Sequence, residues 1–127
     1  MLSVGELLPH VEATTVTGER FMYSHVWQRR NLVLVVLPID DEVAGVAYDA
    51  QLRDQMVPFC AADTACIVTL DRVSGLPSRA VAIADQWGEI AYVAPVDDPS
   101  RLPSPTDLLE WVSYLQRRCP ECEGEAK

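Results

Sequence analysis

The sequence predicts one α/β domain, a three-layer sandwich around a central mixed sheet with an N-terminal β-hairpin extension. Residues 32–37 form a continuous run of leucine and valine, which is typical of a central strand covered by helices on both sides. Residues 66–70 form a second buried strand, and apolar side chains recur at helical spacing between the two runs. A hairpin over residues 80–93 and a C-terminal helix complete the order. A strand–helix–strand unit of this kind takes a right-handed parallel crossover, and the hairpin adds antiparallel strands.

The composition is that of an ordinary globular domain and argues against several classes of partner. The 127 residues suffice for one hydrophobic core, with 49% hydrophobic and 23% charged residues. The 19 acidic residues outnumber the 10 basic ones, so the net charge of −9 repels nucleic acids and anionic membranes. No apolar run approaches the ~20 residues that span a bilayer, and no secretory signal is visible. We therefore expect a cytoplasmic protein without nucleic-acid or membrane partners.

The first thirty residues predict an extended arm and a hairpin. Side chains over residues 11–15 alternate with the period of a strand. The turn falls at residues 17–19, where Gly18 is central, and Phe21 begins the return strand.

A helix is predicted from Asp40 onward. Three acidic residues, 40–42, stand where the positive end of its dipole favours negative charge. One apolar stripe, at spacings of four, four and three, consists of Tyr48, Leu52, Met56 and Phe59. Pro58 is expected to end or kink this helix.

The C-terminal helix has the clearest predicted boundaries. Ser104 is placed to cap it, and Pro105 suits its first position. Its apolar face consists of Leu108, Trp111, Val112 and Leu115. Cys119 precedes a proline, so it avoids helical geometry and closes the helix. The chain therefore divides into a domain over residues 1–118 and an acidic C-terminal tail over residues 119–127.

This order of elements is that of the thioredoxin fold, and the residues resemble its peroxiredoxin branch, the alkyl hydroperoxide reductase and thiol-specific antioxidant group. The matching features are Val4-Gly5 followed by Pro9, Gly18 at the hairpin turn, a central strand ending in Pro38, and Arg79 followed by Asp85 and Gly88. Ala84 replaces the isoleucine of the last pattern. The match runs from about residue 1 to residue 115. The resemblance implies redoxin ancestry and a role in cell redox homeostasis.

The residues at the family's active-site positions depart from its pattern. The resemblance places a Thr or Ser four residues after Pro38, and the peroxidatic cysteine three residues later. These positions hold Glu42 and Gly45, and neither supplies the thiolate that attacks a peroxide. The C-x-x-C of thioredoxin, expected in the same turn, is missing too. We therefore expect a redoxin fold that lacks the usual peroxidatic site.

Arg79 matches the position of the family's active-site arginine. The resemblance implies that it would support a thiolate there, although no thiol is available to support. The residues themselves favour an ion pair with Asp40, Asp41 or Asp85. A catalytic role and a structural ion pair are thus the two interpretations of this side chain.

Cys119 and Cys122 form a C-x-x-C spacing, the one chemical signature in the chain. This spacing suits a thiol/disulfide pair or half of a tetrahedral zinc site, and the third interpretation is a segment with no chemical role. Cys119 closes a helix, where the dipole and the nearby Glu121 and Glu123 disfavour a thiolate. Two neighbouring arginines offset part of this effect.

Cys60 and Cys66 are expected to pack in the core, because free cysteines are among the most buried residues. Their alternative role is to complete a four-thiolate zinc centre with Cys119 and Cys122. Such a centre requires the tail to fold back onto the end of the middle helix.

Three functional hypotheses follow from these residues. The leading one is a peroxiredoxin-like thiol–disulfide oxidoreductase, in which Cys119 and Cys122 exchange with a thiol reductant or a partner protein. The second is a non-catalytic binding module that presents the acidic residues 40–42 to a basic partner surface. The third is a small zinc protein that uses the same cysteine pair. A homodimer is compatible with each, and no cofactor other than zinc is expected.

Overall fold

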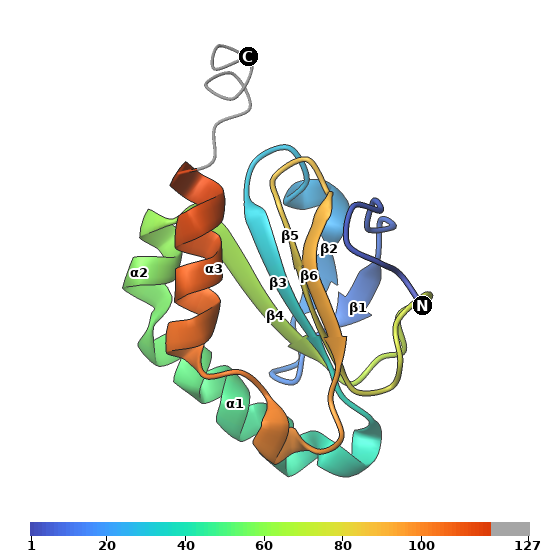
Figure 1. Ribbon diagram of the computed structural model, residues 1–127. Helices are drawn as coiled ribbons and strands as arrows, with labels where there is room; N and C mark the ends of the chain where they lie inside the picture. The colour runs from blue at the N-terminus through green and yellow to red at the C-terminus, as the bar shows by residue number, and fades with distance from the viewer. Residues whose placement is uncertain (118–127) are drawn as a thin grey trace.

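The computed structural model describes residues 1–117, so the predictions for Cys119 and Cys122 lie outside the described residues. The strands and helices follow the predicted order (Figure 1). They are β1 (Glu12–Thr14), β2 (Arg20–Met22), β3 (Asn31–Val36), α1 (Glu42–Asp54), α2 (Met56–Ala61), β4 (Thr64–Thr69), β5 (Ala80–Ala84), β6 (Ile90–Pro95) and α3 (Pro105–Arg117). Short 3₁₀ turns follow β2 (Tyr23–His25), precede α1 (Ile39–Asp41) and precede α3 (Pro99–Arg101).

The central sheet is mixed, as the sequence predicts. Its strand order is β4-β3-β5-β6, with β3 and β4 parallel and the other two pairs antiparallel. Every residue of β3 is buried, because the strand has a neighbour on each edge and a covered face on each side. β1 and β2 form the predicted N-terminal hairpin as a separate two-stranded sheet.

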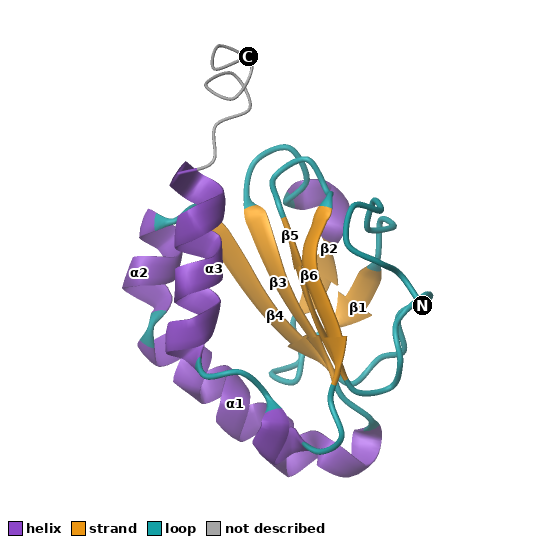
Figure 2. Ribbon diagram, in the orientation of Figure 1, coloured by secondary structure: helices purple, strands orange, loops and turns teal. Residues whose placement is uncertain are grey.

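All three α-helices cover the same face of the central sheet (Figure 2). Val33 and Val35 of β3 pack on that side in one cluster with side chains of α1, α2 and α3. The expectation that helices cover both faces of β3 is therefore wrong. The second face, with Leu32 and Leu34, is covered by apolar side chains of the N-terminal segment, among them Phe21, Tyr23 and Val26. The connection from β4 to β5, residues 70–79, contains one glycine, one proline and five polar residues and forms no helix.

The predicted middle helix is divided at Gln55 into α1 and α2. Pro58 explains the break, because proline donates no amide proton and its ring clashes with the carbonyl four residues earlier, at Asp54. The predicted stripe is confirmed for Tyr48, Leu52 and Phe59, which are buried. It is wrong for Met56, which is 49% exposed because the break rotates the start of α2 out of the α1 register.

α3 begins as the sequence predicts. The hydroxyl of Ser104 accepts a hydrogen bond from the backbone N–H of Asp107 at 3.1 Å, which satisfies one of the free amides at the helix start. On its apolar face Leu108, Val112 and Leu115 are buried, whereas Trp111 is only half-buried. None of the helices within residues 1–117 is long and apolar enough to cross a bilayer.

Candidate functional site

A corner of the molecule forms where β3 ends and α1 begins, and it is here called the α1 corner (Pro38, Asp41, Gly45 and Arg79). Pro38 follows β3, a 3₁₀ turn carries Asp41, and Gly45 is the fourth residue of α1. Arg79 precedes β5, which runs antiparallel to β3, so the start of β5 lies beside the end of β3. The fold therefore brings together positions that are about 40 residues apart in the sequence.

Asp41 and Arg79 form a two-point ion pair in this corner. The Nε and Nη2 atoms of Arg79 donate to the two carboxylate oxygens of Asp41, at 2.5 and 3.1 Å. Nη1 donates to the backbone oxygen of Asp97 at 3.0 Å. Hydrogen bonding to Asp41 raises the pKa of Arg79, so the guanidinium stays charged. The predicted ion pair is confirmed and its partner is Asp41, which is 9% exposed, while a catalytic role for Arg79 stays a prediction.

Gly45 packs against apolar side chains and has little room for a side chain of its own. A Cβ placed on it would lie 3.3 Å from Cδ1 of Leu37 and 3.4 Å from Cγ1 of Val16. The first distance is tighter than ordinary van der Waals contact, and the second lies at its lower limit. The position to which the family resemblance assigns a cysteine therefore lies against methyl groups, four residues along the chain from Asp41.

The two described cysteines differ in their surroundings. Cys60 in α2 is exposed, so the expectation that it packs in the core is wrong; the neighbouring Phe59 occupies the core instead. Cys66 in β4 is half-buried and packs beside the helices. Burial raises the pKa of the Cys66 thiol to about 12, despite the opposing effect of Arg30. Both cysteines line a cavity of about 290 Å³ at the β4 edge of the sheet.

A complete metal site is not formed by the described part of the chain. Within residues 1–117, no three His, Cys, Asp or Glu side chains gather in a way that could hold a metal ion. The four-thiolate zinc centre includes Cys119 and Cys122, which lie outside the described residues, so it stays a prediction.

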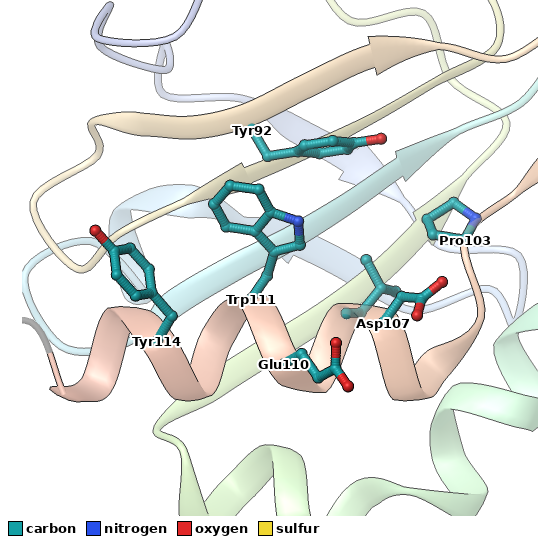
Figure 3. Close-up of a pocket in the computed structure, with 7 residues that line it drawn as sticks. Tyr92, Pro103, Asp107, Glu110, Trp111 and Tyr114 are labelled. Atoms are coloured by element: carbon teal, nitrogen blue, oxygen red, sulfur yellow. The ribbon is translucent and has the colours of Figure 1, made fainter.

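A groove between β6 and α3 was not predicted from the sequence. It is here called the aromatic groove, and it encloses about 510 Å³. It is lined chiefly by Tyr92, Pro103, Asp107, Glu110, Trp111 and Tyr114. The rings of Trp111 and Tyr92 lie 5.4 Å apart, and those of Trp111 and Tyr114 lie 6.3 Å apart, edge to face. In Figure 3, Trp111 lies between the two tyrosines, and the carboxylates of Asp107 and Glu110 project from the same helix.

The helical spacing alone predicts Trp111 as a packing residue, and it does not predict this groove. Tyr92 and Trp111 are separated by 19 positions, and only the docking of α3 beside β6 brings them together. The available signal was Tyr114, three residues after Trp111 and therefore on the same side of the helix.

Comparison with known proteins identifies the fold. No family model matches the sequence, and the search of curated proteins finds no match. The reduced 2-Cys peroxiredoxin of Plasmodium vivax is similar in structure, with a TM-score of 0.68, 12% identity, and coverage of 92% of this chain and 83% of that one. Peroxidoxin BcpB of Mycobacterium tuberculosis gives a TM-score of 0.62 and 13% identity, with coverage of 92% and 97%.

A proposed protein disulfide isomerase from Bacteroides thetaiotaomicron is also similar. Its TM-score is 0.59 at 12% identity, with coverage of 93% of this chain and 92% of that one. At these identities the likeness establishes the fold, which is thioredoxin-like in a peroxiredoxin-like arrangement.

Proposed function

We propose that this protein is a redoxin-fold thiol–disulfide oxidoreductase that works through Cys119 and Cys122, without a peroxidatic site at the α1 corner. The residues of that corner support the absence of a peroxidatic site. A peroxidatic site needs a thiolate beside free hydrogen-bond donors. Here the donors of Arg79 are engaged by Asp41, and Gly45 stands where the resemblance places the sulfur.

The remaining cysteines support the same assignment by elimination. The pKa of Cys66 is raised to about 12, so almost none of this thiol is ionised at neutral pH. Cys60 is exposed but has no second cysteine at C-x-x-C spacing, because the next cysteine along the chain is Cys66. The C-x-x-C pair is left as the arrangement suited to closing a small disulfide ring.

The proposed reaction is a two-step thiol–disulfide exchange. A thiolate of the pair attacks one sulfur of a partner disulfide; that S–S bond breaks, and a mixed disulfide forms. The second cysteine attacks the mixed disulfide and releases the partner's other thiol. The pair loses two electrons and two protons and closes as a Cys119–Cys122 disulfide, and the partner gains them as two thiols. A dithiol reductant restores the pair by the same exchange.

The proposal predicts a disulfide reductase activity that depends on the C-terminal pair. The measurement is the rate at which dithiothreitol reduces insulin disulfides with and without the protein, alongside the rate of hydrogen peroxide consumption. Wild type is expected to accelerate insulin reduction, and Cys119→Ser/Cys122→Ser is expected to abolish the acceleration. Cys60→Ser, which removes an exposed thiol elsewhere, is the matched control and keeps it.

The two readouts separate the parts of the proposal. Wild type that fails to accelerate insulin reduction, or that does so equally with the double substitution, removes the oxidoreductase assignment. Rapid peroxide consumption that survives the double substitution contradicts the account of the α1 corner.

A second candidate function is a non-catalytic binding module, and the aromatic groove is the observation that favours it. The acidic face expected at residues 40–42 is reduced to Asp40 and Glu42, because Asp41 is buried against Arg79. The groove instead combines concavity, exposed rings and carboxylates. Ligand binding that is unaffected by Cys119→Ser/Cys122→Ser, in a protein inactive on insulin, would favour this candidate over the first.

A further inference from the structure

We propose that the aromatic groove binds an arginine side chain presented by an extended basic peptide. This inference goes beyond the proposed thiol chemistry and does not depend on it, because no groove residue is a cysteine.

The shape of the aromatic groove suits a small planar group. A volume of about 510 Å³ falls within the range of small-ligand pockets. Trp111 is half-buried and Tyr114 is 48% exposed, so both rings present surface to solvent as well as to the groove. The rings of Trp111 and Tyr92 are tilted by 45° to each other, and both rings line the groove together with Pro103 (Figure 3). A planar guanidinium stacks on such surfaces.

The charge of the aromatic groove suits a cation. The residues that line the groove include the carboxylates of Asp107 and Glu110 and no lysine, arginine or histidine. Within residues 1–117 these two carboxylates form no ion pair. A neighbouring hollow of about 280 Å³ shares Trp111 and Tyr114 and adds Glu89. Rings and carboxylates together favour a cation, and arginine, which both stacks and donates in a planar fork, suits them better than lysine.

The free edge of the sheet favours a peptide over an isolated cation. β6 is the last strand of the central sheet within the described residues, and the N-terminal arm bonds to it only at its start, through Ile90. Val96 donates to the backbone oxygen of Arg79, the residue before β5, and alternate residues of an antiparallel strand face opposite edges. The backbone groups of Val93 therefore point away from β5, beside Tyr92. A peptide strand can pair there while its side chain enters the groove.

Charge also distinguishes a basic peptide from two other possible occupants of the aromatic groove, the chain's own C-terminal residues and a second copy of the chain. The chain's own residues 118–127 contain three glutamates against one arginine and one lysine, so their net charge has the same sign as the groove. A second copy of this chain would bring a further net charge of −9 and the same carboxylates. A basic peptide alone brings the opposite charge.

The test is an NMR titration of the full-length protein with the blocked peptide acetyl-Thr-Arg-Thr-Arg-Thr-amide at low salt. The indole N–H of Trp111 and the amide of Val93 are the reporters. We expect saturable shifts at both, with a Kd below about 1 mM. The same peptide with citrulline in place of arginine keeps the shape and loses the charge, and should bind about tenfold more weakly.

Matched variants separate a built site from general attraction to an acidic protein. Glu110→Gln is expected to weaken binding by about three- to tenfold. Asp54→Asn, which removes one exposed charge at the end of α1, is expected to leave binding unchanged. Tyr114→Ser, at an exposed position, tests the rings without opening the core.

Three results would overturn the proposal. The first is equal affinity for the arginine and citrulline peptides. The second is equal weakening of peptide binding by Asp54→Asn and Glu110→Gln, which would show that only the net charge of the protein attracts the peptide. The third is a dimer by light scattering whose dissociation on dilution shifts the same reporters, which would assign the groove to a second copy of the chain.

Discussion

The α1 corner and the aromatic groove lie against the same sheet and differ in one respect. In the corner, Asp41 and Arg79 form an ion pair with each other, and methyl groups pack against Gly45. In the groove, rings and carboxylates face solvent around a concavity. The α1 corner, where the family resemblance expects an active site, is thus filled by the chain's own side chains. The surface that is open to a ligand is the aromatic groove. Function must therefore be argued from the sites, because the fold alone does not carry it.

The largest effect is expected from forcing a thiol into the closed corner. Gly45→Cys restores the residue type that the resemblance expects, but its Cβ would press on Leu37 and Val16. We expect unfolding in urea to show a loss of about 1–3 kcal/mol, the range typical of overpacked cores. We also expect no gain in peroxide consumption, because Asp41 rather than a free cation stands nearby.

Gly45→Ala is the control for this substitution, since it adds the Cβ without the sulfur and gains helix propensity of about 1 kcal/mol. A Gly45→Cys protein that is as stable as wild type and consumes peroxide rapidly would show that the corner is open after all.

A smaller effect is expected at alkaline pH from the thiol enclosed beneath the helices. Burial raises the pKa of Cys66 from 9.0 to about 12. Between these values the unfolded chain loses the thiol proton while the folded chain keeps it, so stability is full below pH 9 and falls as pH rises. At pH 10.5 the loss is about 2 kcal/mol relative to neutral pH. Cys66→Ala should lose this part of the pH dependence.

The alkaline loss of stability is measured as the difference in the free energy of urea unfolding between pH 7.5 and pH 10.5. Burial raises the pKa of Tyr23 to about 12 and also raises the pKa of Tyr48, so both tyrosines contribute an alkaline loss in wild type and variant. The part of the Tyr48 shift that comes from the Cys66 charge is lost with the thiol and belongs to the same difference. Cys60→Ala, at the exposed thiol, serves as control and should keep most of the pH dependence, because burial, and not the Cys60 charge, is the largest cause of the raised Cys66 pKa. Identical pH dependence in wild type and Cys66→Ala would show that this thiol is not enclosed.

The smallest effect concerns the ion pair itself. Arg79→Gln leaves the Asp41 carboxylate buried without its partner, and we expect a lower midpoint of thermal unfolding. Arg20→Gln breaks the pair with Glu12, in which both side chains are more than half exposed, and should leave the midpoint unchanged. Adding Asp41→Asn to Arg79→Gln should recover part of the loss. Equal midpoints of thermal unfolding for Arg79→Gln and Arg20→Gln would show that the Asp41–Arg79 pair stabilises the protein no more than an exposed surface pair does.

The fold was predictable where a local pattern decides it. β3 was placed within about one residue and the start of α3 was placed at Pro105, because an unbroken valine–leucine run and a Ser104-Pro105 start are local signals. The side chains that cover the second face of the sheet were not predictable, because Phe21 and Tyr23 contact β3 only through the packing of the N-terminal segment on the sheet.

The site was predictable only in part. Three neighbouring acids were candidates for Arg79, and the backbone of the 3₁₀ turn turns Asp41 inward while Asp40 and Glu42 stay exposed. The absence of a thiol at Gly45 was readable directly, whereas the methyl groups that close over it were not. The aromatic groove depends on a contact between β6 and α3 that no local spacing encodes.

The central claim is tested most directly by locating the disulfide that forms under redox control. The full chain would be equilibrated in mixtures of reduced and oxidised dithiothreitol, alkylated, and mapped by mass spectrometry. The account predicts one disulfide, joining Cys119 to Cys122, with Cys60 and Cys66 alkylated as free thiols after unfolding. A disulfide between Cys60 and Cys66, with Cys119 and Cys122 remaining reduced throughout, would contradict it.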